Sequence, residues 1–128
     1  MTTLPERSHA AEDAWVVALT DAPVEVLLDA AHAALDAGRP GLGARVVGLM
    51  PTSVADSEPG LARARTAARL LLVAPVDRRG PVIAELEAAV QACRAAHMAR
   101  ARARHRENAR DALDPSRPRR LPRRTRGR

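Results

Sequence analysis

Apolar residues recur every three or four positions through most of the first 98 residues, which is the spacing of one face of an α-helix. The longest such pattern starts at the Gly-Pro pair of residues 80–81. Proline suits the first helical position, because its φ is preset and its missing N–H would be unpaired there. The pattern predicts one long helix over residues 80–114, with a core-facing stripe of Ile83, Leu86, Val90, Cys93 and His97.

This long helix changes chemical character near residue 99, where the apolar stripe stops and arginines point in several directions around the axis. A helix that is polar all round is solvated, covered by an anionic partner, or frayed until a partner binds. The Asp-Pro pair at 114–115 should end the helix. The remaining residues are rich in Arg and Pro, and they predict a disordered basic tail.

Four shorter helices are predicted before the long one, with boundaries marked by capping residues, Gly and Pro. The first spans residues 8–20 with Ser8 as its N-cap, and the second runs from 21 or 23 to 37 and is stopped by Gly38. The third covers 42–50, and the fourth is capped by Ser57 and ends before Pro75. The inward-facing residues should be Trp15, Val16, Leu19, Val24, Leu27, Leu28, Ala31, Ala34, Leu35, Leu61, Ala64, Ala68, Leu71 and Leu72.

Composition supports an all-α class, a small bundle of four to five helices with a long C-terminal helix and a disordered basic tail. Hydrophobic residues make up 46% of the chain, yet Trp15 is the only aromatic residue, so the core must consist of Ala, Leu and Val. Small side chains let helices approach closely. We expect a helical body over residues 1–98 and an arginine-rich helix end with a flexible tail over 99–128.

The net charge of +6 is unevenly distributed. Residues 1–98 contain nine Arg and twelve acids, a net charge of −3, whereas residues 99–128 contain twelve Arg and three acids, a net charge of +9. All 21 basic residues are Arg, a choice that a GC-rich bacterial genome also explains. The clustering of the arginines, rather than their identity, therefore carries the functional argument.

Clustered arginines favour binding to a phosphate backbone through counterion release, without a particular geometry. The absence of aromatic residues beside them argues against base stacking and for contact with duplex DNA or folded RNA. The alternatives are an acidic protein or another anionic surface as the partner, and a solubilising tail with no partner. The predicted nucleic-acid-binding residues are Arg100, Arg102, Arg104, Arg106, Arg110, Arg117, Arg119, Arg120, Arg123, Arg124, Arg126 and Arg128.

Two groups of residues could carry other chemistry. Glu25, Asp29, His32 and Asp36 share one face of the second helix and could bind a divalent metal, which would make the protein a metal-dependent enzyme. Alternatively this acidic stripe docks arginines, either Arg63 and Arg69 or the tail. Cys93 and His97 lie one turn apart as a thiol–imidazole pair, although both belong to the apolar stripe, where a buried Cys and a satisfied His are expected.

Residues 27–51 resemble a single tetratricopeptide-type helical hairpin, with small residues at Ala31, Ala34 and Gly43 and a turn at Gly38. No second copy follows at the 34-residue period, so a solenoid is not indicated. The same segment resembles a helix-turn-helix through Ala34, Gly38, Ala44 and Val47, but its second helix offers almost no side chain that reads a base edge. Neither resemblance assigns the chain to a family.

The sequence predicts a small non-enzymatic protein without a cofactor. Its body should contact proteins, either a partner or a second copy, and its C-terminal segment should bind nucleic acid. The runner-up is a helical adaptor for an acidic protein. No Gly-rich phosphate loop or nucleophile elbow is present, and the longest aliphatic run is too short to span a bilayer. One cysteine fits a reducing compartment, so we expect a cytoplasmic location.

Overall fold

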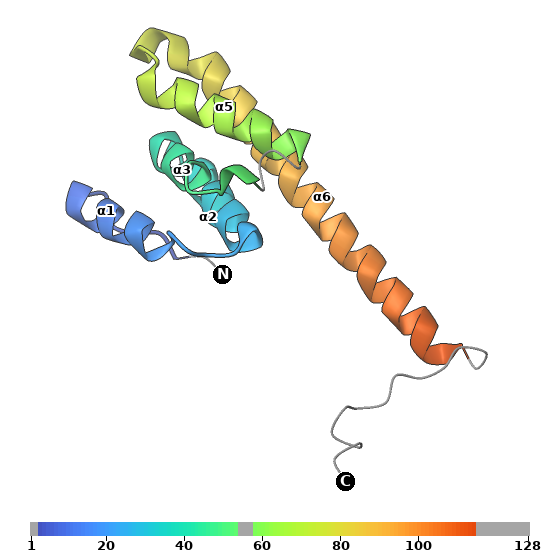
Figure 1. Ribbon diagram of the computed structural model, residues 1–128. Helices are drawn as coiled ribbons and strands as arrows, with labels where there is room; N and C mark the ends of the chain where they lie inside the picture. The colour runs from blue at the N-terminus through green and yellow to red at the C-terminus, as the bar shows by residue number, and fades with distance from the viewer. Residues whose placement is uncertain (1–2, 54–57, 115–128) are drawn as a thin grey trace. The chain divides into compact units, whose positions relative to one another are not determined.

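The structure is a computed structural model that describes residues 3–53 and 58–114. These residues contain five α-helices and no strand, which confirms the all-α prediction of a small bundle with a long C-terminal helix (Figure 1). The predicted disordered tail lies outside the described residues. The helices are α1 (His9–Ala18), α2 (Val24–Asp36), α3 (Pro40–Val47), α5 (Pro59–Val73) and α6 (Arg79–Leu113), with a 3₁₀ turn, η1 (Val76–Arg78), before the last.

Two helix ends have the predicted caps. The Ser8 hydroxyl accepts a hydrogen bond from the Ala11 N–H at 3.2 Å, so it caps the first turn of α1. Gly38 follows α2 with φ of 75°, a left-handed conformation that costs glycine little because it has no Cβ. The Arg39 N–H then donates to the Ala34 carbonyl at 2.8 Å, which satisfies one of the carbonyls exposed at the end of α2.

Two predicted helix starts are wrong. α3 begins at Pro40 rather than Leu42, because proline itself takes a first-turn position. α6 begins at Arg79, one residue before the predicted start at Gly80, because η1 leads directly into it and the backbone is already helical there. Pro81 still lies in the first turn, where its missing N–H has no intrahelical partner to lose. The predicted Ser57 cap of α5 lies outside the described residues.

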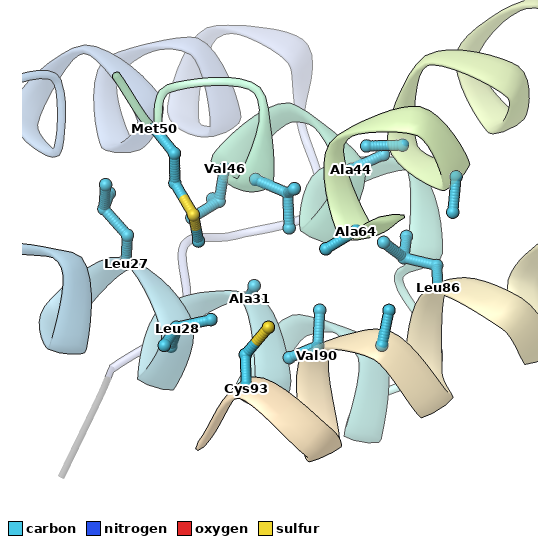
Figure 2. Close-up of a cluster of buried hydrophobic side chains, with 14 of the residues drawn as sticks. Leu27, Leu28, Ala31, Ala44, Val46, Met50, Ala64, Leu86, Val90 and Cys93 are labelled. Carbon is cyan, nitrogen blue, oxygen red and sulfur yellow. The ribbon is translucent and has the colours of Figure 1, made fainter. Parts of the chain in front are cut away.

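The core is formed by α2, α3, α5 and the first part of α6 (Figure 2). The side chains of Leu27 and Leu28 from α2, Val46 from α3, Leu61 from α5 and Leu86 from α6 are almost completely buried. The predicted inward face of α5 is wrong at Leu72, which is 51% exposed. The adjacent Leu71 is 2% exposed, so the buried face of α5 includes Leu71 and excludes Leu72, which lies about 100° further around the helix.

Small residues let α5 and α6 approach closely. A Cβ added at Gly60 of α5 would lie 3.1 Å from the Cys93 Sγ atom of α6. Ala64, Ala67 and Ala68 of α5 and Ala89 of α6 are all buried in the same cluster. The core contains no fully buried aromatic side chain, and its space is filled because the helices lie close together.

Several contacts attach the residues before α2 to the bundle, and one buried arginine makes three of them. The Arg39 side chain is 8% exposed, and its guanidinium donates to the Pro5 carbonyl at 2.7 Å, the Glu6 carbonyl at 3.2 Å and the Glu12 carboxylate at 2.6 Å. Trp15 is half-buried and packs against the core, and its Nε1 donates to the Thr3 carbonyl at 3.0 Å. These bonds hold both α1 and the segment that precedes it.

The chain divides into two units, Met1–His97 and Met98–Arg128. The first unit contains the helical core described above. In the second unit the described residues are 98–114, which continue α6 to Leu113.

Candidate nucleic-acid interface

The described part of the second unit is an exposed, arginine-rich helical segment. Every residue from 98 to 113 is exposed, including the five arginines. Residues 98–114 contain five Arg and three acids, a net charge of +2. A partner could therefore contact the side chains of this helical segment without disturbing the apolar core.

The local sequence explains why this segment is helical without core contacts. Between residues 91 and 113 there is no Gly, no Pro and no β-branched residue, and most positions hold Ala or Arg, which are strong helix formers. Arg110 lies in the last turn, where a cation interacts favourably with the negative end of the helix dipole. The helix is also nucleated by the packed first half of α6, so only elongation is needed here.

The structure places five of the twelve predicted nucleic-acid-binding residues. These five are exposed side chains of α6, namely Arg100, Arg102, Arg104, Arg106 and Arg110. The other seven lie outside the described residues, namely Arg117, Arg119, Arg120, Arg123, Arg124, Arg126 and Arg128.

The acidic stripe of α2 does dock an arginine, but it is one that the sequence did not indicate. The Arg94 Nε atom of α6 donates to the Asp29 carboxylate at 3.1 Å. Arg63, one of the partners that the sequence suggested, instead binds Glu85 of α6 through both its Nε and its Nη2 atoms, the latter at 2.8 Å. The sequence signal for Arg94 is its position next to buried Cys93, which directs it along the edge of the apolar stripe toward a neighbouring helix.

The Arg63–Glu85 pair shifts the pKa of both side chains. A hydrogen bond from Arg63, and then its charge, holds the pKa of Glu85 below its usual value. The hydrogen bond to Glu85, followed by its charge, raises the pKa of Arg63. Both side chains are about half exposed, so the pair is a surface contact between α5 and α6, and solvent screening limits its contribution to stability.

The acidic stripe does not assemble into a metal site. His32 and Asp36 line a shallow groove of about 300 Å³, whose α6 side contains Glu87 and Gln91. In residues 3–53 and 58–114, no three His, Cys, Asp or Glu side chains come together in a way that could hold a metal ion. Within the stripe itself, the Asp29 carboxylate is already paired with Arg94.

Cys93 is a buried core residue as expected, whereas the expectation of a satisfied histidine is wrong, because the His97 Nε2 atom has no hydrogen-bond partner among the described residues. The Cys93 side chain is 3% exposed and lies among Ala31, Val90 and Leu28 (Figure 2). The His97 Nε2 atom is 3.7 Å from the Glu58 Oε2 atom, which is beyond hydrogen-bonding distance.

A second hollow of about 460 Å³ lies beside α1 and α3, and it is lined by the side chains of Arg7, Arg39 and Arg45. Each of these arginines already has a partner within the fold. Arg7 donates to the Ala37 carbonyl at 3.4 Å, Arg39 forms the network described above, and Arg45 donates to the Asp13 carboxylate at 2.6 Å. These hydrogen bonds and ion pairs connect α1 and the residues before it to α2 and α3.

Comparison with known proteins gives no relative from which a function could be inferred. No protein-family model, no curated protein and no solved structure matches the chain. Of the helices in the described ranges, none is both long enough and apolar enough to cross a membrane.

Proposed function

We propose that this chain is a small non-enzymatic cytoplasmic protein of bacterial type. In this proposal the C-terminal end of α6 and the residues that follow hold nucleic acid through its phosphate backbone, without strong sequence preference. The helical body makes contacts with a partner protein or a second copy.

The single observation that carries this proposal is the exposed, arginine-rich second half of α6. Guanidinium groups suit phosphate oxygens because they donate in a planar fork and stay charged. A helix keeps such groups at fixed spacing, which reduces the entropy lost when several phosphates are contacted together. The only aromatic residue, Trp15, belongs to α1 and hydrogen-bonds to Thr3, so base stacking has no platform in this segment.

Fluorescence anisotropy of labelled duplex DNA and of a folded RNA hairpin tests the proposal. The full chain should bind both, with affinity that falls steeply as salt concentration rises. If the five helical arginines each neutralise one phosphate, the slope of log K against log salt should be at least about −4 on B-DNA. A full-length variant in which all five are alanine should have a slope smaller in magnitude by about 4, and any slope that remains belongs to the arginines after α6.

A truncated chain of residues 1–98 is the second arm of the same experiment. Far-UV circular dichroism and thermal unfolding establish that it retains the helical body. It should not bind either nucleic acid at low salt. Binding by neither the full chain nor the truncated chain would contradict the proposal, and it would favour the alternative of an adaptor whose arginines bind an acidic protein.

Protein contact by the body is supported by exposed aliphatic side chains at the end of α5 and in η1. Leu70 is 53%, Val73 79% and Val76 83% exposed, within a stretch of seven residues. Neighbouring exposed aliphatic residues are typical of protein-binding surfaces. Sedimentation of the full chain and of a Leu70→Ser/Val73→Ser/Val76→Ser variant distinguishes self-association, which the variant should lose, from a monomer that needs a different partner.

A further inference from the structure

Because residues 98–113 form a helix, their charged side chains are distributed unevenly around the helix axis, which is not evident from the order of the residues. With 3.6 residues per turn, successive side chains are separated by about 100° around the axis. Arg102, Arg106 and Arg110 are four residues apart, so they fall within an arc of about 80°. The remaining charged residues fall within a different arc of about 60°, namely Arg100, Arg104, Glu107 and Asp111.

These two arcs differ in net charge. The first contains three arginines and no acid, whereas the second contains two arginines and two acids. The centres of the two arcs are about 130° apart around the helix. The whole net charge of this helical segment therefore lies on one side, although every residue of the segment is exposed.

The spacing of the three arginines matches a line of phosphates. A rise of 1.5 Å per residue places Arg102, Arg106 and Arg110 about 6 Å apart along the axis, over a total of about 12 Å. A duplex strand carries one phosphate per about 3.4 Å of its axis, so flexible guanidinium groups at this spacing can each reach a phosphate.

The acids on the other arc argue against insertion of the helix into a groove. A helix is about 10–12 Å in diameter and the major groove about 12 Å wide, so an inserted helix has phosphates on both flanks. Glu107 and Asp111 would then face one phosphate strand and be repelled. One-sided contact along the outside of the backbone leaves both carboxylates in solvent.

We propose that α6 binds one phosphate strand of a nucleic-acid duplex through the side formed by Arg102, Arg106 and Arg110. Arg100 and Arg104 contribute less, because Glu107 and Asp111 share their side and offset their charge. This inference rests on the proposed function and narrows it to one face of the helix and to a double-stranded partner.

Two full-length variants with matched changes test this assignment. Arg102→Ala/Arg106→Ala and Arg100→Ala/Arg104→Ala each remove two arginines four residues apart, and each replaces them with the best helix former. Circular dichroism establishes that both keep the wild-type helix content. Binding to a labelled DNA duplex is then measured by anisotropy over a range of salt concentrations.

The first variant should reduce the salt slope by about 1.8, which corresponds to two phosphate contacts. The second variant should reduce it by less than about half of that amount, and its Kd at low salt should lie closer to the wild-type value. The same ranking should hold for an RNA duplex, since the contacts are to phosphates.

Other outcomes would overturn the assignment. Equal losses in the two variants would mean that phosphates surround the helix, and unchanged slopes in both would mean that the residues after α6 carry the binding. Either result leaves the proposed function in place if the wild type binds with a steep salt slope. A wild-type chain that binds no duplex at low salt would refute the proposed function as well.

Discussion

The contact between α2 and α3 gives the sharpest test of how this core is packed. Gly43 is buried in α3, and a Cβ added there would lie 3.0 Å from the Leu35 Cγ atom and 3.3 Å from the Ala31 carbonyl oxygen. The Leu35 side chain is mostly buried, and the carbonyl belongs to the backbone of α2, which a side-chain rotation cannot move. Gly43→Ala therefore pushes the two helices apart.

Two effects of opposite sign set the magnitude. Replacing Gly by Ala in a helix interior contributes about 1 kcal/mol through backbone entropy. Overpacking a filled core costs about 1–3 kcal/mol. We expect Gly43→Ala to lower the free energy of unfolding by about 1 kcal/mol, which for a domain of this size lowers Tm by roughly 4–8 °C.

Gly41→Ala in the same helix is the control, because nothing lies within 4 Å of the Cβ it would add. It should raise the free energy of unfolding by about 0.5 kcal/mol, so the two variants should differ by about 1.5 kcal/mol. Urea unfolding followed by circular dichroism and by the fluorescence of Trp15 measures both. If Gly43→Ala were as stable as Gly41→Ala, close packing at this position would be wrong.

Three further predictions follow from individual contacts. Arg39→Ala should cost about 3 kcal/mol in urea unfolding, because it strands two carbonyls and the Glu12 carboxylate, whereas Glu12→Gln should cost less; equal costs would contradict the network. The pKa of Glu85 is lower in the folded state, so its pair with Arg63 stabilises the fold above the ordinary value of 4.5 and is lost as pH falls through the folded pKa. Thermal unfolding of Glu85→Gln from neutral to acid pH should therefore show a shallower loss of stability than the wild type, and a parallel curve would refute this. Amide hydrogen exchange should be much faster over residues 98–113 than over 86–93, because the former have no buried contact; equal protection would mean that something covers them.

Several features could be predicted because they depend on residues close together in the chain. Apolar spacing identified the buried stripe of α6, and Leu86, Val90 and Cys93 are indeed buried. The Ser8 cap and the left-handed Gly38 are local backbone preferences, and both are confirmed. The loss of the apolar face near residue 99 is likewise a local property, and the structure describes exposed residues from 98 to 113.

Other features depend on which helices become neighbours. Arg39 and Glu12 are 27 residues apart, and Arg94 and Asp29 are 65 apart, so no spacing rule connects them. Sequence periodicity shows that a charged side chain lies beside an apolar stripe, but it does not show which residue of a neighbouring helix is its ion-pair partner. For the same reason Arg63 was matched with α2 when its partner is Glu85 of α6.

The amino-acid sequence alone therefore determined the helical class, the centre of the buried stripe of α6 and the concentration of arginine after residue 98, whereas Ile83 and His97 at the two ends of the predicted stripe are only partly buried. These follow from local propensity and from the 3.6-residue period, which act within one or two turns. Only the tertiary structure decided that Leu72 stays exposed and that Gly43 and Gly60 are points of close approach. Those outcomes depend on the distances between helix axes, which are set by the combined volume of side chains far apart in the chain.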